Sequence, residues 1–432
     1  MRFISLENPD LIGQNNTPMQ DQKIAIIGAG LSGLVAAINL ENAGFEPEIF
    51  EATDRAGGRV KTDYREGYIF DHGFQVLLTE YPATQKYLNY DLLDLEKFYP
   101  GAVIYNQGKQ DKIGDPLRQL SLLFPTLTSK IGSFADKLKI LKLNTELKKK
   151  SFDDIFLAEE KTTLHYLQDY GFSSDIIHNF FKPFFTGIFL EHELKTSSRK
   201  FEFVYKMFGK GSAAIPKKGI QAIPNQLIAQ LKQTKIHFNT PIESIQDQQV
   251  IFKNGGVEHF DFVIIATEAS HLISNLNNQQ TLWKSVDNFY LSVKQRAYKE
   301  PMIGLIADDD ALVNNFYYTS KPKAEEHLLS VSIVKPHKLS QEELKDKITE
   351  DLKTYVGIDT LEFKRFYRIK KALPIMQTVT YMLPKSETQL KDQIFLAGDQ
   401  LANGSINAAM LNGESAAQAV ISKIKDGFIN LG

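Results

Sequence analysis

The stretch GAGLSGLVAAINLENAGFEPEIFEATDRAGGRV, Gly28 to Val60, determines which fold the chain adopts. The segment before it, KIAII, is a short apolar run typical of a buried strand, and residues 31–43 carry apolar side chains at helical spacing. Glycines at G-x-G-x-x-G spacing between a strand and a helix predict a dinucleotide-binding unit. The stretch therefore predicts an α/β fold built on a parallel sheet.

The three glycines of this turn have separate expected roles. Gly28 makes the tight turn, Gly30 lets backbone amides approach a pyrophosphate, and Gly33 allows the helix to pack closely on the strand. Leu31 and Ser32 begin the helix, whose N-terminus places partial positive charge beneath the phosphates. The pattern up to this point fits either NAD or FAD.

A second predicted strand, EPEIFEA, ends at Glu51 and Ala52. An acid about 20 residues after the glycines is expected to hold the ribose hydroxyls of a dinucleotide. The Glu51 carboxylate would repel a ribose 2′-phosphate, which argues against NADP.

The second glycine pair bears on the choice between NAD and FAD. EATDRAGGRVKT resembles the signature E-A-x-x-R-x-G-G-R-x-x-T of the flavin amine oxidase superfamily, which includes monoamine oxidases, protoporphyrinogen oxidase and phytoene desaturases. The resemblance implies noncovalent FAD, with Gly57 and Gly58 bringing backbone up to the cofactor. It also implies that Arg59 neutralises the cofactor phosphates, a task that suits a bidentate guanidinium.

The far end of the chain resembles another motif of the same superfamily. DQIFLAGDQLANGSINAAMLNGESAAQAV covers residues 392–420, and its resemblance to the C-terminal flavin motif implies that Gly398 and Asp399 meet the ribityl and phosphate region. A helix predicted to start near Ser405 would turn the amides near Ile406 and Asn407 toward the flavin pyrimidine. Reduced flavin carries negative charge there, which a helix N-terminus stabilises.

Three further stretches resemble this superfamily. FDHGFQVLL resembles the segment beside the isoalloxazine, which implies that Gly73, Phe74 and Gln75 lie near the ring. IPKKGIQAIPNQLIAQL resembles the P-x-G-G-M stretch, with Lys218 in place of the first glycine and Ile220 in place of the methionine.

The third of these stretches is HFNTPIESI, a predicted strand in which the backbone of Ile242 would contact the adenine. The next strand, FVIIATEAS, places Ala266 and Thr267 at its end.

The flavin motifs lie in three separated regions, so the FAD-binding Rossmann-like domain is expected to be discontinuous, at residues 20–80, 212–275 and 385–432. The pieces between them, 81–211 and 281–384, are expected to form a second, α+β substrate-binding domain. Their patterns predict mainly helices in the first piece and an antiparallel sheet in the second, with the helices covering the sheet. Residues 1–19 are expected to be a loose extension.

The most apolar cluster outside these motifs is HNFFKPFFTGIFLEHEL. It resembles a stretch of the desaturase-like and protoporphyrinogen-oxidase-like members, which implies that Phe181, Phe184 and Phe185 wall an apolar substrate pocket leading to the flavin. The alternative is that these rings are plain core at a domain junction.

The implied reaction is hydride transfer from a C–H bond of a lipophilic small-molecule substrate to FAD, with oxygen, a quinone or another carrier as electron acceptor. His72 is the candidate acid or base, although it could instead support the turn. Amine oxidases also hold a water near the flavin with a lysine, and SVDNFYLSV has no lysine before Lys294. Amine oxidation and flavin-dependent isomerisation without net redox change therefore remain alternatives to desaturase-like or dehydrogenase-like chemistry.

Composition limits the remaining possibilities. The 432 residues carry 50 basic and 52 acidic side chains, a net charge of -2 that gives no indication of nucleic-acid binding. There is no cysteine, which excludes disulfides and thiolate metal sites, and no metal site is expected. We expect a cytoplasmic protein, because no signal peptide or membrane span is visible. The basic helix predicted at residues 134–150 could make peripheral contact with anionic lipid, or be an ordinary solvated helix.

Overall fold

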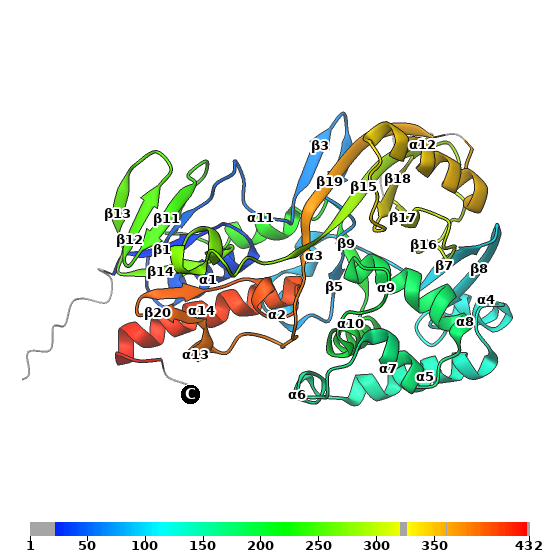
Figure 1. Cartoon of the computed structure of the whole chain (residues 1–432), viewed down its shortest axis with the longest axis horizontal. Coiled ribbons are helices and arrows are strands. Elements are labelled where there is room, and N and C mark those ends of the chain that lie inside the picture. The colour runs from blue at the N-terminus through cyan, green and yellow to red at the C-terminus, as the bar shows by residue number, and fades with distance from the viewer. Residues whose placement is uncertain (1–21, 320–325, 360, 430–432) are drawn as a thin grey trace, which may run out of the picture.

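A computed structural model describes residues 22–319, 326–359 and 361–429. The extension expected at residues 1–19 lies outside the described residues. Figure 1 shows a parallel sheet toward one end of an elongated molecule and a larger, mainly antiparallel sheet toward the other. The long strands β15 (Trp283–Val293) and β19 (Glu362–Pro374) run between the two ends. The predicted combination of a Rossmann-like parallel sheet with an α+β part is confirmed.

The parallel sheet has the strand order β10-β2-β1-β14-β21-β20. All neighbours in it are parallel except β20 and β21. Its strands are β1 (Ile24–Ile27), β2 (Glu48–Phe50), β10 (Lys235–His237), β14 (Phe262–Ile265), β20 (Gln389–Lys391) and β21 (Ile394–Leu396). These strands come from three distant regions of the chain, so one sheet brings together the glycine turn after β1, the end of β2 and the C-terminal motif.

The side chains of β1 point alternately to the two faces of this sheet, and each face is covered by different elements. Ile24 and Ile26 pack with helices α1 (Leu31–Asn42) and α14 (Ile406–Asp426). Ala25 and Ile27 face the other way, onto a small antiparallel sheet of β11 (Ile242–Gln246), β12 (Gln249–Phe252) and β13 (Val257–His259). Both faces are therefore buried, which explains the unbroken apolar run of the sequence.

Two close contacts of helix α1 leave no room for a side chain. A Cβ atom on Gly413 of α14 would lie 2.1 Å from the Ser32 carbonyl oxygen of α1. A Cβ on Gly33 would lie 2.0 Å from the Gly28 carbonyl oxygen. This second contact is the close packing of helix on strand that the glycine pattern predicted.

The larger sheet has the order β19-β15-β18-β17-β16-β7-β8, with only β16 and β7 parallel. Its remaining strands are β7 (Gly101–Asn106), β8 (Lys109–Gly114), β16 (Ile303–Ile306), β17 (Val313–Tyr318) and β18 (His327–Ile333). Helix α12 (Gln341–Asp351) buries Leu344 and Ile348 on one face. The helices between residues 120 and 210 pack against the opposite face.

The region from residue 81 to 210 is mainly helical, as predicted, but it also contains strands that the prediction missed. Its helices are α2 (Pro82–Tyr87), α3 (Tyr90–Leu93), α4 (Leu123–Thr128), α5 (Phe134–Lys149), α6 (Phe152–Phe156), α7 (Thr163–Asp169), α8 (Ser174–Ile176), α9 (Lys182–Phe189) and α10 (Ser198–Lys210). Strands β7 and β8 form a hairpin whose turn places Gln107 and Gly108 at positive φ. Asn-Gln-Gly in the sequence was the available signal for this turn.

A third small sheet pairs β5 (Leu77–Leu78) and β6 (Leu95–Lys97) with β9 (Ala213–Pro216). A hairpin of β3 (Thr62–Arg65) and β4 (Tyr68–Asp71) leads into it. No helix in the described part of the chain is long and apolar enough to cross a membrane.

Replacing Gly413 by alanine tests the crossing of α1 and α14. The added methyl group has to displace backbone, so we expect a loss of about 2 kcal/mol in the free energy of unfolding, a typical cost of overpacking. Urea denaturation of the apoprotein measures the loss. The control is Ser422→Ala, on the partly exposed face of the same helix. An equal stability for both variants would contradict the close crossing.

Candidate active site

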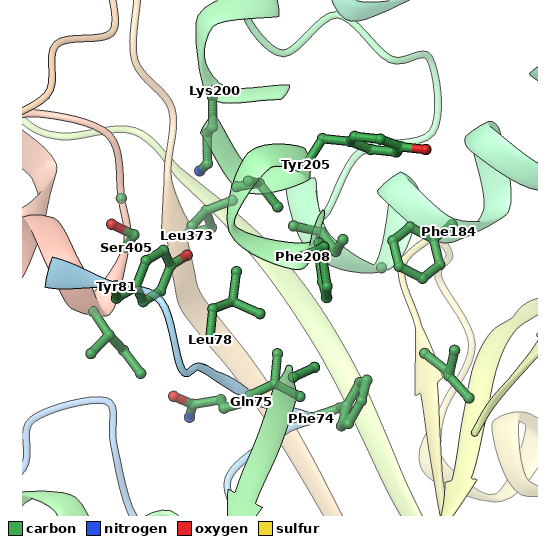
Figure 2. A pocket seen from close by; sticks show the side chains of 18 of the residues that line it. Phe74, Gln75, Leu78, Tyr81, Phe184, Lys200, Tyr205, Phe208, Leu373 and Ser405 are labelled. Atoms are coloured by element: carbon green, nitrogen blue, oxygen red, sulfur yellow. The ribbon is translucent and has the colours of Figure 1, made fainter. Parts of the chain in front are cut away.

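A cavity of about 950 Å³ runs from the carboxyl ends of the parallel strands into the helical region. The loops after β1, β2, β14 and β21 all contribute residues to its wall, because parallel strands present their carboxyl ends at one edge of a sheet. Figure 2 shows its wall near Ser405 and Gln75 on one side and near Tyr205, Phe208 and Phe184 on the other. The cavity therefore has a polar end, lined by backbone loops, and continues from there into a compartment lined by aromatic side chains.

The glycine turn after β1 forms part of the polar end. Gly28 has a φ of +104°, which suits the tight turn predicted for it, and its N–H donates to the Phe50 carbonyl oxygen at 2.8 Å. A Cβ on Gly30 would meet nothing within 4 Å and would stand in the open cavity. Gly30 also forms a parallel bridge to Gly57, so the two glycine clusters lie side by side.

Glu51 lies on the cavity wall and is largely buried. One carboxylate oxygen accepts the Ala29 N–H at 2.9 Å, and the other accepts the N–H and hydroxyl of Thr53 at 2.9 and 2.7 Å. These bonds fix the carboxylate at the end of β2 and leave further lone pairs for a polyol. The predicted contact with ribose hydroxyls is compatible with this position.

Arg59 and Asp399, which are 340 residues apart, form an ion pair on the cavity wall. Arg59 also donates to the Ala372 carbonyl oxygen at 3.3 Å and stacks 4.9 Å above the Trp283 ring. The sequence predicted both partners as cofactor residues, but it did not predict that they bind each other. Arg59 would have to share its guanidinium between this carboxylate and the cofactor phosphates.

Most of the predicted cofactor residues line the cavity together. They are Gly28, Gly30, Leu31, Ser32, Glu51, Gly57, Gly58, Arg59, Gly73, Phe74, Gln75, Ala266, Thr267, Gly398, Asp399, Ser405 and Ile406.

Four predicted cofactor residues lie behind this wall. Gly33 is buried between α1 and β1, and Ala52 is exposed just beyond β2. Ile242 pairs with Phe252 in the small antiparallel sheet. The Asn407 side chain accepts the Ala83 N–H at 3.0 Å and so joins α14 to α2. These four residues are not among those that line the cavity; the roles predicted for Gly33, Ile242 and Asn407 are helix packing and backbone contacts, which need no side chain on the wall.

The segment predicted to run beside the flavin ring follows β4. Gly73 has a φ of +86°, and the Gln75 side chain donates to the carbonyl oxygens of Arg59 and His72 at 2.9 and 3.0 Å. The Phe74 ring packs on Tyr317, with ring centroids 4.4 Å apart. These contacts hold the segment rigidly against the first flavin motif.

His72 lines the cavity but also belongs to a polar cluster beside it. Its Nε2 lies 3.2 Å from Oδ2 of Asp63, and this oxygen also accepts a hydrogen bond from the Tyr367 hydroxyl at 2.8 Å. The other oxygen of Asp63 accepts from the Arg55 guanidinium at 2.7 Å. Burial lowers the pKa of His72, although Asp63 opposes the shift. Burial opposes ionisation of Asp63, but hydrogen bonds from Arg55, Tyr367 and His72 hold its pKa well below the ordinary value. His72 thus lies beside an Asp63 carboxylate that is stabilised in its ionised form.

The predicted pocket phenylalanines divide between two faces. Phe184 lines the cavity, together with Phe180 and Ile188, four residues before and after it. Phe181 and Phe185 are instead fully buried, and Phe185 packs on Phe201 with centroids 4.8 Å apart. Of the three predicted rings, only Phe184 lines the cavity, and its role as a wall for substrate stays a prediction. A π-helix, η3 (Ile177–Phe181), leads directly into α9.

Helix α10 supplies functional residues that the sequence analysis missed. Lys200, Val204, Tyr205 and Phe208 all line the cavity. Lys200, Val204 and Phe208 recur every four residues and so share one helix face, which runs from the polar end to the aromatic compartment. A lysine on an otherwise apolar helix face was the signal in the sequence. Among the residues described, no cluster of histidine and acidic side chains is arranged for a metal.

Comparison with known proteins agrees with these motifs. The family profile described as flavin containing amine oxidoreductase matches residues 31–421. The chain is 22% identical to protoporphyrinogen oxidase 2 of Arabidopsis thaliana, with 94% of each chain covered. L-amino-acid oxidase BmooLAAO-I of Bothrops moojeni is 31% identical, but the match spans only 28% of this chain and 26% of that protein. The structure of cyclohexylamine oxidase from Brevibacterium oxydans gives a TM-score of 0.69 at 14% identity, covering 94% and 100% of the two chains, and so shares the fold.

The polar end of the cavity fits FAD on independent grounds. Space is left open above Gly30, where a pyrophosphate would need close backbone approach. Arg59 supplies positive charge at the same end of the cavity, and Glu51 supplies acceptors for hydroxyl groups. Ile406 is the first residue of α14, so the helix leaves its N–H without an internal acceptor.

Replacing Gly30 by alanine tests this fit. Gly30 has a φ of -71°, so alanine adopts its backbone without strain, and the new methyl group enters only the open space. We expect an unchanged melting temperature of the apoprotein and a dissociation constant for FAD at least tenfold higher, or about 1.4 kcal/mol. Quenching of FAD fluorescence measures the affinity. Gly256→Ala, in the turn between β12 and β13, is the control, and equal affinities for both variants would refute the assignment.

Proposed function

The chain belongs to the family of flavin-containing amine oxidoreductases and uses FAD, and we propose that it transfers a hydride from a C–H bond of a lipophilic small molecule to this cofactor. The observation that carries the proposal is the continuity of the cavity. Its polar end contains the flavin motifs, and its other end is walled by aromatic and aliphatic side chains. A lipophilic substrate would therefore reach the cofactor without crossing a polar barrier.

The aromatic compartment supports an apolar substrate. Its wall contains Phe74, Phe98, Ile113, Phe180, Phe184, Ile188, Tyr205, Phe208 and Ile303. Arg118 also lies there, but its guanidinium is engaged, donating to the carbonyl oxygens of Phe208 and Gly211. Binding would be driven mainly by removal of apolar surface from water.

The side chains of this site would contribute orientation and exclusion of water. FAD, when bound, supplies the hydride acceptor. Phe74, held by Tyr317, and Phe184 would confine the substrate next to the cofactor, and positioning of this kind lowers the barrier to hydride transfer. We assign His72 a supporting role, because its contacts with Asp63 and Tyr367 hold the turn before Gly73.

Lys284 bears on the alternative of amine oxidation. It lies near the start of β15, immediately before SVDNFYLSV, the segment in which amine oxidases would have their lysine. Its Nζ donates to the Phe189 carbonyl oxygen at 2.9 Å and the Thr196 hydroxyl at 3.2 Å, and it is not among the cavity-lining residues. Its position gives no support to a lysine-held water at the flavin, so we rank amine oxidation below dehydrogenase-like chemistry.

The oxygen reactivity of the reduced holoprotein tests this ranking. We expect the photoreduced protein to be reoxidised slowly by air and faster by a lipophilic quinone, which the apolar channel admits. Stopped-flow absorbance of the flavin and a peroxide assay measure both reactions. Rapid reoxidation in air with stoichiometric peroxide would instead identify an oxidase. Conversion of a substrate without any bleaching of the flavin would identify an isomerase.

We also propose the domain division that the motifs predict. Residues 20–80, 212–275 and 385–432 would form the FAD-binding part, and residues 81–211 and 281–384 the substrate-binding part. In support, the parallel sheet takes all its strands from the first set and the seven-stranded sheet takes all its strands from the second.

A lipid surface is the proposed source of the substrate. Seven exposed apolar side chains, here called the mouth patch, gather between residues 117 and 138, namely Leu117, Leu120, Leu123, Phe124, Leu127, Phe134 and Leu138. Leu123, Leu127, Phe134 and Leu138 also line the cavity, so the cavity opens at this patch. Apolar groups of this kind, with Lys130 exposed beside them, suit contact with an anionic bilayer.

Vesicle binding tests the mouth patch. We expect the wild-type protein to sediment with vesicles containing anionic phospholipid at low salt. The double variant Leu120→Ser with Phe124→Ser should bind at least tenfold more weakly, because each side chain contributes about 1.5–3 kcal/mol when fully buried. Leu282→Ser, an exposed apolar residue outside the patch, is the control. Absence of wild-type binding at low salt would remove the proposal.

A further inference from the structure

Lys200 is a buried lysine whose amino group makes no hydrogen bond or ion pair within the described part of the protein. Its side chain is only 5% exposed, and it lies on the cavity wall. In Figure 2 it extends from α10 toward Leu373, with Ser405 alongside. The centroid of the Phe189 ring lies 5.8 Å from its Nζ.

Two other lysines, the buried Lys206 and the partly buried Lys284, both have hydrogen-bond acceptors. Lys206, on the same helix and equally buried, donates to three carbonyl oxygens at the end of α5, at 2.6 to 2.9 Å. Lys284 donates to a carbonyl and a hydroxyl oxygen. A buried cation without an ion-pair partner or a hydrogen-bond acceptor in contact costs several kcal/mol, so such a group is retained at sites where it acts on a ligand.

The charges around Lys200 come from three other segments. Lys284 faces it from β15, Arg59 from the loop after β2, and Asp399 from the loop after β21. Burial lowers the pKa of Lys200 to about 7, Lys284 and Arg59 lower it as well, and Asp399 opposes them. The arrangement places a titrating amine at the end of the cavity where the flavin motifs meet.

We propose that Lys200 is a catalytic residue that contacts the flavin and stabilises the negative charge the ring gains on reduction. When the substrate C–H bond breaks, both electrons leave with the hydrogen, so the ring gains one negative charge and the substrate one positive charge, which it loses as a proton. The Lys200 ammonium faces that new charge together with the unbonded N–H groups at the start of α14. This assignment rests on the proposed function, because it names the residue that would stabilise the charge formed by hydride transfer to FAD.

Sulfite is a suitable probe, because it adds to flavin N5 and leaves negative charge on the ring without any substrate. We expect the sulfite dissociation constant of the Lys200→Met holoprotein to be at least tenfold higher than that of the wild type at pH 6. Lys200→Arg should restore most of the affinity. Lys210→Met, which removes an exposed charge from the same helix, is the control.

The pH dependence separates a charge effect from a structural one. Lys200 is protonated below its pKa and neutral above it. The sulfite dissociation constant of Lys200→Met, divided by that of the wild type, should therefore fall toward one as the pH rises above that pKa. Taking this ratio cancels the titration of sulfite itself. Replacing Lys284 by methionine removes a neighbouring positive charge, which should move the fall to higher pH.

Two results would overturn the proposal. One is an equal sulfite affinity for Lys200→Met and wild type at pH 6. The other is a ratio that stays constant with pH, which would indicate a purely structural role. Neither result depends on the identity of the substrate, so a failure here is distinguishable from a failure of the proposed function. Lys200→Met removes a buried charge and its desolvation cost, so we expect this variant to fold. Flavin absorbance confirms that each variant is loaded with FAD.

Discussion

The site depends on a parallel sheet whose strands end at one edge. Strands β1, β2, β14 and β21 come from residues that are hundreds of positions apart, yet their following loops share one cavity wall. Close approach of these loops requires positions without side chains. Gly30 and Gly57 meet there as neighbouring backbones, and Gly413 lets α14 cross α1 at contact distance. The remaining features of the site are built on this edge.

Charge is arranged unevenly along the cavity. Arg59 and Asp399 neutralise each other across the loops, whereas Lys200 makes no hydrogen bond or ion pair within the described residues. Beyond Lys200 the same face of α10 continues with Val204 and Phe208. The proposed apolar substrate would thus lie in a compartment that offers it little polar contact, and the positive charge would be concentrated where the cofactor changes its own charge. This separation suits a reaction in which the protein contributes positioning and electrostatics.

The cofactor end could be predicted from the sequence because its motifs are local. A turn that needs a positive φ, such as the one at Gly28, requires glycine in any chain that forms it, so the glycine is visible in the sequence. The substrate end could not be predicted to the same detail. Phe184 shares a helix face with Phe180 and Ile188 and lines the cavity, whereas Phe185 is buried in the core, and the run of phenylalanines in the sequence does not tell these two faces apart. Lys200 was missed because its burial results from packing of segments far apart in sequence.

A crystal structure of the yellow holoprotein is the most direct measurement of the central claim. The account predicts electron density for the diphosphate over Gly30 and beside Arg59. It predicts density for the isoalloxazine ring between the segment that follows Gly73 and the pair formed by Lys200 and Ser405. Density for FAD outside this cavity, or a ring with Lys200 turned away from it, would contradict the account.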